Sequence, residues 1–198
     1  MENNTKELGK IKDTNFSIIS NNCIGGFIYK YFNIEYKTPT LWLFIVARDY
    51  IKFLSNIRYY LEQKLEFIKP DESDNYEEFK EYAHLMKFPM ARLGDIEIFF
   101  MHYKSREEAE EKWYRRIKKI NWDDLIVIMS DNETFSYDIL KEFAALPYKN
   151  KICFTKEEYP DIDCAYCIEE MNDRSKVCDA EMVSKYFDIA QFINNRIK

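Results

Sequence analysis

Residues 16–27 read FSIISNNCIGGF and give the first strong structural signal of the chain. The apolar run at 16–20 breaks at once into two amides, a cysteine and a glycine pair, which is typical of a buried strand that ends in a tight loop. The glycines Gly25 and Gly26 suit either a plain turn or the close approach of a phosphate-bearing ligand. Residues 27–32 then form a short predicted helix whose free amides would face the loop.

The same pattern of an apolar strand followed by polar residues recurs twice. The segment 96–101 precedes His102, and the segment 125–130 precedes Asp131 and Asn132. In a parallel sheet the carboxyl ends of the strands meet at one edge, where ligands usually bind. We therefore expect a site at that edge, built from Asn21, Asn22, Cys23, Gly25, Gly26, His102, Asp131 and Asn132.

The order of the remaining segments predicts an α/β fold of three layers, Rossmann-like, with a mainly parallel sheet and a C-terminal helix. Helices are expected at 41–65 with Thr40 as its cap, at 106–120 after the capping box of Ser105, at 136–145 and at 180–197. A short strand is expected at 151–155, and the acidic segment 68–92, with His84 at the surface, is interpreted as an exposed excursion.

Composition predicts one globular domain over 1–198. The 198 residues are 46% hydrophobic and include only 4 glycines and 5 prolines, so no flexible linker divides them. Residues 1–14 are expected to form a flexible arm, and residues 161–198 a cysteine-bearing loop and a final helix. The net charge of −6 argues against a nucleic-acid binder. The longest apolar run, 41–47, is too short to span a bilayer, so a cytoplasmic protein without a transmembrane segment is expected.

Cys23, His102 and Asp131 are the candidates for catalysis. An imidazole can take a thiol proton, and a carboxylate or amide from Asp131 or Asn132 can orient the imidazole. The alternative for Cys23, and the more common one for a free cysteine, is a small buried side chain at the end of a strand. The five cysteines are expected to be free thiols. Cys164, Cys167 and Cys178 lack a nearby histidine, so no metal site is predicted, although Cys153 would supply a fourth sulfur.

Polar and basic side chains suit a sugar or sugar-phosphate ligand. Short amides and carboxylates pair with sugar hydroxyls, and the candidates are Asn21, Asn22, Asp131, Asn132 and Glu133. Arg115, Arg116 and Lys119, on the basic half of the helix at 106–120, offer phosphate contacts, although their order also suits the helix dipole. Arg48 and Asp49 are interpreted as solvated or locally paired. The sequence identifies no cofactor.

Three segments together resemble a bacterial family catalogued as domain of unknown function 1919. They are SNNCIGG (20–26), MHYKSREEAEEKWYRRIKKIN (101–121) and LPYKNKICFT (146–155). The resemblance implies a part in exopolysaccharide or capsule biosynthesis, with polysaccharide-assembly enzymes as partners. A looser likeness to putative papain-like cysteine peptidases implies Cys23 as nucleophile, His102 as base and Asp131 or Asn132 as the orienting group.

The expected function is an enzyme of bacterial surface-polysaccharide assembly, a transferase acting on a sugar or sugar phosphate. Two alternatives stay open at this point. One is a non-catalytic module that binds a glycan or nucleotide-sugar, and the other is a Cys–His hydrolase.

Overall fold

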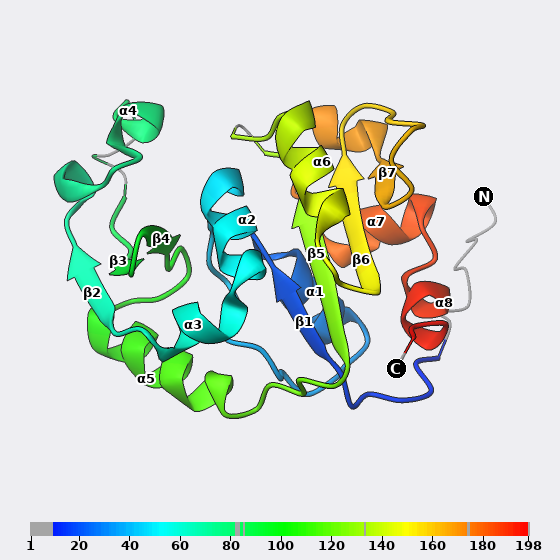
Figure 1. Ribbon diagram of the computed structural model, residues 1–198, viewed down its shortest axis with the longest axis horizontal. Helices are drawn as coiled ribbons and strands as arrows, with labels where there is room; N and C mark the ends of the chain where they lie inside the picture. Colours follow the sequence, from blue (N-terminus) through cyan, green and yellow to red (C-terminus); the bar gives the residue numbers. More distant parts are fainter. Residues whose placement is uncertain (1–9, 82–83, 85, 133, 174, 198) are drawn as a thin grey trace.

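Figure 1 shows two sheets, joined by helices that lie between them. The computed structural model describes residues 10–81, 84, 86–132, 134–173 and 175–197. In these ranges a parallel sheet has the order β1-β5-β6-β7 and an antiparallel sheet has the order β2-β3-β4. The parallel strands are β1 (Ser17–Ser20), β5 (Leu125–Ser130), β6 (Asn150–Thr155) and β7 (Ala165–Cys167). The antiparallel strands are β2 (Leu65–Ile68), β3 (Met90–Leu93) and β4 (Ile96–Phe99).

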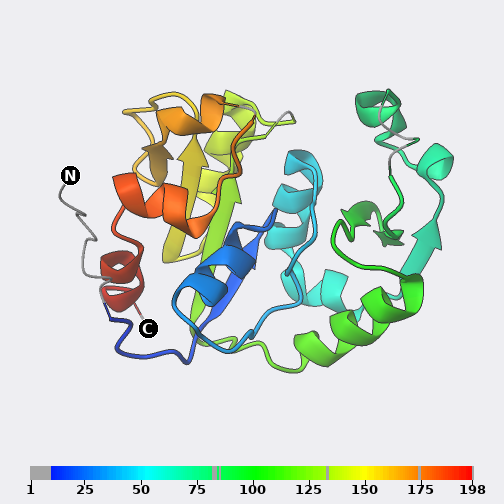
Figure 2. The ribbon, with the colours of Figure 1, turned by 180° about the vertical axis from the view of Figure 1, so that it is seen from behind.

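Helices cover both faces of the parallel sheet. Helices α1 (Ile24–Tyr31), α7 (Ala180–Tyr186) and α8 (Ile189–Asn194) lie on one face, while α2 (Ala47–Ser55) and α6 (Tyr137–Ala145) lie on the other (Figures 1 and 2). Alternate residues of β5 serve the two faces, because side chains along a strand point to opposite sides. Ile126 and Ile128 join the cluster under α1 and α7, whereas Val127 and Met129 join the cluster under α2 and α6. The predicted three-layer α/β fold with a mainly parallel sheet is confirmed.

Local signals placed several elements correctly. Strand β5 has the predicted bounds, and α5 (Arg106–Ile117) begins where the capping box indicated but ends earlier than predicted. The hydroxyl of Ser105 accepts the Glu108 N–H at 3.2 Å. Ser136 caps α6 in the same way, since its hydroxyl accepts the Ile139 N–H at 3.3 Å.

The strand before His102 does not belong to the parallel sheet, so that expectation is wrong. β4 pairs antiparallel with β3, in the register Leu93↔Ile96. The two strands are joined by Gly94, whose φ of 66° suits a tight hairpin turn, and Asp95. A strand that follows so short a turn pairs with the strand before it. The segment 68–92, predicted as an excursion, therefore overlaps β3. The short helix α4 (Tyr76–Phe79) and the 3₁₀ turn η1 (Pro70–Glu72) lie between β2 and β3.

The long helix predicted at 41–65 is also wrong. Residues 41–46 are not helical: Trp42 has a φ of 61°, and the segment 44–46 is extended. The helix is divided into α2 and α3 (Ile57–Glu62) at Asn56, where φ is −149°. Thr40 caps no helix, because its hydroxyl accepts the Ser20 N–H at 3.1 Å. The extended segment ties the two sheets together: Ile45 N–H donates to the Asn21 carbonyl at 2.9 Å, and Phe44 forms a bridge with Phe99 of β4.

The C-terminal region contains more structure than the predicted loop and single helix. It includes β7, the 3₁₀ turn η3 (Glu169–Asn172) and two short helices in place of one. Asp179 caps α7 and Asp188 caps α8. Residues 1–9 of the predicted arm lie outside the described residues, while Lys10 and Lys12 make backbone hydrogen bonds with Asn194.

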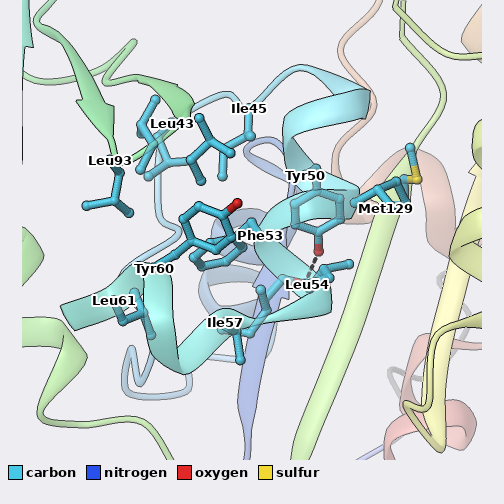
Figure 3. Close-up of a cluster of buried hydrophobic side chains, with 14 of the residues drawn as sticks. Leu43, Ile45, Tyr50, Phe53, Leu54, Ile57, Tyr60, Leu61, Leu93 and Met129 are labelled. Atoms are coloured by element: carbon cyan, nitrogen blue, oxygen red, sulfur yellow. Dashed lines mark hydrogen bonds between the residues drawn. The ribbon is translucent and has the colours of Figure 1, made fainter. Parts of the chain in front are cut away.

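One apolar cluster connects the two sheets. Figure 3 shows α2 and α3 contributing Tyr50, Phe53, Leu54 and Ile57 to a cluster that also contains Met129 of β5. The same cluster includes Leu43, Ile45, Tyr60, Leu61 and Leu93, so it reaches the antiparallel sheet. The Tyr50 hydroxyl donates toward the carbonyls of Ile19 and Ile128, at 2.9 and 3.0 Å. This shared core fixes the position of one sheet against the other.

Among the helices that the structure describes, none has both the length and the apolar character needed to cross a membrane.

Candidate functional site

A cavity of about 1010 Å³ lies at the carboxyl edge of β5 and β6 and extends to α4, in the segment between β2 and β3. One wall comes from the loops after β5 and β6, the start of α6 and η3, the opposite wall from α4 and the segment 44–46, and the floor from the first turn of α2. Its lining residues are Phe44, Val46, Arg48, Asp49, Asn75, Glu78, Phe79, Asn132, Thr134, Ser136, Ile139, Lys156 and Met171. The site therefore lies at the predicted edge of the sheet, but it is built largely from other residues.

The wall after β5 is held by a chain of hydrogen bonds. Asn132 Oδ1 accepts the N–H of Thr134 at 2.9 Å and its hydroxyl at 2.7 Å. Thr134 Oγ1 in turn accepts the Ala47 N–H at 2.8 Å, which caps the start of α2 from a distant part of the chain. Both α2 and α6 thus begin at the cavity, and helix N-termini favour an anionic group.

Asp131 orients a cation and does not orient His102. Its Oδ2 accepts the Lys156 N–H at 3.2 Å, and its Oδ1 lies 3.5 Å from Lys156 Nζ. The Asp131 N–H donates to the Phe154 carbonyl at 2.8 Å, which fixes the loop between the two strand ends. Lys156 thereby reaches the cavity from β6 with its ammonium partly neutralised by Asp131.

The opposite wall presents aromatic and amide groups. Phe44 and Phe79 both pack on Phe99, with ring centroids 5.9 and 5.4 Å apart. Asn75 Nδ2 donates to Glu97 Oε2 at 2.9 Å, so the wall is anchored to β4. Aromatic faces with nearby amides suit the apolar face and the hydroxyls of a sugar ring.

The floor of the cavity carries two charged residues, of which one is exposed and the other is buried. Arg48 is exposed and pairs with Glu142 at 2.9 Å, as the paired interpretation predicted. Asp49 is only 8% exposed, and its Oδ2 accepts the Glu97 N–H at 2.9 Å. Burial raises the pKa of the Asp49 carboxyl, while the hydrogen bond from Glu97 and the charge of Lys52 act in the opposite direction. For Asp49 the solvated half of the prediction is wrong, while the contact of its Oδ1 with Lys52 Nζ at 4.0 Å agrees with local pairing.

Asn21 has a structural role in the parallel sheet. Its side chain is fully buried, and it exchanges two hydrogen bonds with the backbone of Ser130: Asn21 Nδ2 donates to the carbonyl at 3.1 Å and Asn21 Oδ1 accepts the N–H at 2.9 Å. This clasp joins the carboxyl ends of β1 and β5. The neighbouring Asn22 is half-buried, and its Oδ1 accepts the Ile24 N–H at 3.1 Å at the start of α1.

The glycine pair lies inside α1 and not in a loop. A Cβ on Gly25 would come within 2.7 Å of Ser20 Oγ, and one on Gly26 would come within 3.1 Å of the Trp42 ring. The two glycines therefore let α1 pack closely on β1 and on Trp42. The expectation of a glycine turn or phosphate loop at this point is replaced by helix packing.

Cys23 and His102 do not form a pair. The part of the chain that the structure describes contains no hydrogen bond between them; His102 is exposed and packs edge-on against Trp42, with centroids 5.9 Å apart. Cys23 is half-buried at the start of α1, and burial raises the pKa of its thiol to about 11. Neither residue lines the cavity.

We expect Cys23 to react slowly with iodoacetamide in the native protein. A thiol pKa of about 11, against the ordinary 9.0, leaves about 100-fold less thiolate at pH 8. Mass spectrometry of the Cys23 peptide, labelled natively and in urea, measures the ratio. Rapid native labelling that His102→Ala slows would contradict this account and restore the nucleophile hypothesis.

The basic helix α5 does not contribute to the cavity lining. Arg115 pairs with Glu111 along the helix, and Lys119 pairs with Glu35, at 2.7 and 2.6 Å. Arg116 is buried and donates to the Tyr103 hydroxyl. Their charges are thus engaged in structural contacts, as the alternative interpretation of this helix anticipated.

The five cysteines are free thiols. Across residues 10–197, leaving out the few positions without a described placement, no cluster of three or more His, Cys, Asp or Glu side chains suits a metal ion. Glu133, a further candidate for sugar binding, lies outside the described residues, and His84 is exposed as predicted.

The fold and the cavity define an α/β protein with a ligand-sized hollow at the carboxyl edge of its parallel sheet. The chain belongs to the family described as domain of unknown function (DUF1919), whose model matches residues 1–195. It is also 31% identical, over 189 residues, to an uncharacterized protein of Haemophilus influenzae; the match covers 93% of this chain and 85% of that protein. The family resemblance noted in the sequence is thereby confirmed.

Sequence reasoning missed the residues that line most of the cavity. Phe44, Phe79 and Lys156 carry no local signal, because only tertiary structure brings them together. Asp49 did carry one: it is an acid among the apolar residues of a helix, where burial is expensive unless the group is paired or functional.

Proposed function

We propose that this protein is an enzyme of bacterial surface-polysaccharide assembly that binds a sugar phosphate in the cavity between its two sheets and transfers a group to or from it. The observation that carries the proposal is the composition of the cavity walls. Phe44 and Phe79 offer faces for a sugar ring, and Arg48 and Lys156 offer cations for a phosphate. The link to surface polysaccharide rests on the family resemblance alone.

The phosphate is expected on the side of the parallel sheet. Lys156 lies there, and both α2 and α6 begin there, where Thr134 accepts the Ala47 N–H and Ser136 accepts the Ile139 N–H. The N-terminal ends of two helices and an ammonium together form a favourable site for a dianion. The sugar ring would then extend toward Phe79 and Asn75, where amide groups can pair with its hydroxyls.

Lys156→Gln is expected to weaken the binding of glucose 1-phosphate by about tenfold or more, because it removes a charge-assisted hydrogen bond. Lys119→Gln is the matched control, since it removes the same charge from a lysine that does not line the cavity. Isothermal titration calorimetry of both variants, with uncharged methyl α-glucoside as a second ligand, measures the effect. Equal losses in the two variants, or no saturable binding by the unaltered protein, would contradict the proposal.

The polysaccharide part of the proposal has its own test. A strain that lacks this protein should produce less cell-surface polysaccharide, measured as hexose released from the cell surface. The unaltered chain and Lys119→Gln should restore production, whereas Lys156→Gln should not. Unchanged production in the deletion strain would contradict this part and leave the sugar-phosphate site standing.

A Cys–His hydrolase is less well supported, because Cys23 and His102 are not paired and the thiol pKa is raised.

A further inference from the structure

Asp49 is a buried carboxyl at the cavity whose hydrogen bond joins α2 to β4. It lines the cavity, is 8% exposed, and has one strong partner, the Glu97 N–H on its Oδ2. Its Oδ1 lies 4.0 Å from Lys52 Nζ, too far for a hydrogen bond. An amide at this position would serve the Glu97 N–H equally well, so among the described contacts only the long one with Lys52 makes use of the acid's charge.

The charged groups around Asp49 come from every side. They are Arg48 and Lys52 of α2, Glu97 of β4, Asp95 in the β3–β4 turn, Glu142 of α6, and Lys156, Asp131 and Glu78 around the cavity. Glu97 and Asp95 disfavour the ionised form of Asp49, and Lys52 favours it. Burial is the largest effect and raises the pKa of Asp49.

An ionised Asp49 would repel a phosphate bound beside it, whereas a neutral carboxylic acid can donate a hydrogen bond to a phosphate oxygen. Both groups share one cavity whose cations are already partly neutralised, Arg48 by Glu142 and Lys156 by Asp131. A bound dianion would therefore raise the pKa of Asp49 further, because like charges in one site do not both persist.

We propose that Asp49 is a specificity-determining residue of the sugar-phosphate site, and that as a neutral acid it donates a hydrogen bond to a phosphate oxygen of the ligand. The inference rests on the proposed function. Its consequence is that binding of the dianion takes up one proton from solvent, which comes to rest on Asp49. Ligands that carry a phosphate are then favoured over neutral sugars, and more so at lower pH.

The test is calorimetry with glucose 1-phosphate between pH 7.5 and 8.5, where the phosphate is a dianion. The observed enthalpies in Tris and in HEPES give the number of protons taken up. We expect a value near one for the unaltered protein and near zero for Asp49→Asn. The affinity of the unaltered protein should fall by up to tenfold per pH unit, while that of Asp49→Asn stays level.

Each outcome of the calorimetry either supports or overturns the proposed role of Asp49. Binding by the unaltered protein without proton uptake overturns the role of Asp49 and leaves the sugar-phosphate site standing. Equal uptake by the unaltered protein and Asp49→Asn assigns the proton elsewhere and also overturns it. Absence of saturable binding overturns both the proposed function and this inference. The uptake measurement on the unaltered protein needs no variant, so it decides even where a substitution impairs folding.

Thermal unfolding provides an independent result. The pKa of folded Asp49 is raised above the ordinary 3.8, so ionisation at neutral pH disfavours the folded state. Asp49→Asn should therefore raise the Tm at pH 7–8, and the gain should vanish as the pH falls below 3.8. Asp95→Asn is the control with the opposite sign, because hydrogen bonds from Tyr60 and Lys52 lower the pKa of Asp95. A fall in Tm for Asp49→Asn at pH 7–8 would contradict the raised pKa.

Discussion

Glu97→Ala is expected to destabilise the protein by about 3–5 kcal/mol, the usual cost of removing one partner from a buried charged network. The side chain is 2% exposed and accepts hydrogen bonds from the Ser73 hydroxyl, the Asp74 N–H and Asn75 Nδ2. Arg92 Nε lies 3.4 Å from its carboxylate. The substitution leaves these donors without their acceptor and releases the wall that carries Phe79. Urea unfolding measures the loss of stability, and glucose 1-phosphate binding should weaken with it.

Glu66→Ala is the matched control for Glu97. Glu66 is an exposed acid on β2 and stands opposite the same Arg92 in the sheet register. We expect this substitution to cost less than about 1 kcal/mol, as exposed cross-strand pairs do. A similar loss from both substitutions would show that Glu97 does not anchor the cavity wall.

Asn21→Ala is expected to cost about 2–4 kcal/mol. It removes both hydrogen bonds of the clasp with Ser130 and leaves a buried N–H and carbonyl short of a partner. The carboxyl ends of β1 and β5 lose the connection on which the cavity depends. Urea denaturation again provides the measurement.

Asn22→Ala is the control that distinguishes the loss of the Asn21–Ser130 hydrogen bonds from a general effect of losing an amide side chain. Asn22 is half-buried and accepts one hydrogen bond, from Ile24 N–H, so its removal should cost about 1 kcal/mol as the loss of a helix cap does. If Asn22→Ala proved as damaging as Asn21→Ala, the clasp would not be the source of the stability.

Several strands and helix starts that depend only on neighbouring residues were predicted correctly from the sequence. The strand at 125–130 and the helix starts at Ser105 and Ser136 follow from short-range patterns, namely apolar runs and capping hydroxyls. The order of the predicted strands and helices along the chain was sufficient to predict the three-layer α/β fold.

Tertiary pairing was the part that sequence patterns left open. The apolar segment 41–46 has helical spacing, yet it is not helical, because Ile45 bonds to Asn21 and Phe44 bonds to Phe99. The strand before His102 looks like a parallel strand, yet the hairpin at Gly94 pairs it with β3. A local pattern cannot distinguish these outcomes, because both depend on distant partners.

The candidate site shows the same difference between what local patterns predict and what tertiary pairing decides. A cavity does lie at the carboxyl edge of the sheet, where the sequence predicts a site, and Asn132 lines it. Cys23, His102 and Asp131 were expected to converge, but only Asp131 lies beside the cavity residues, through Lys156. The opposite wall comes from α4, which lies between β2 and β3 in the chain, and from the segment 44–46, and neither position could be derived from strand and helix order.

The most direct test of the sugar-phosphate site is a crystal structure of the protein with glucose 1-phosphate. The phosphate is expected within hydrogen-bonding distance of Lys156 Nζ and Asp49, with the sugar ring against Phe79. A ligand bound instead between Cys23 and His102, with the cavity empty, would contradict it.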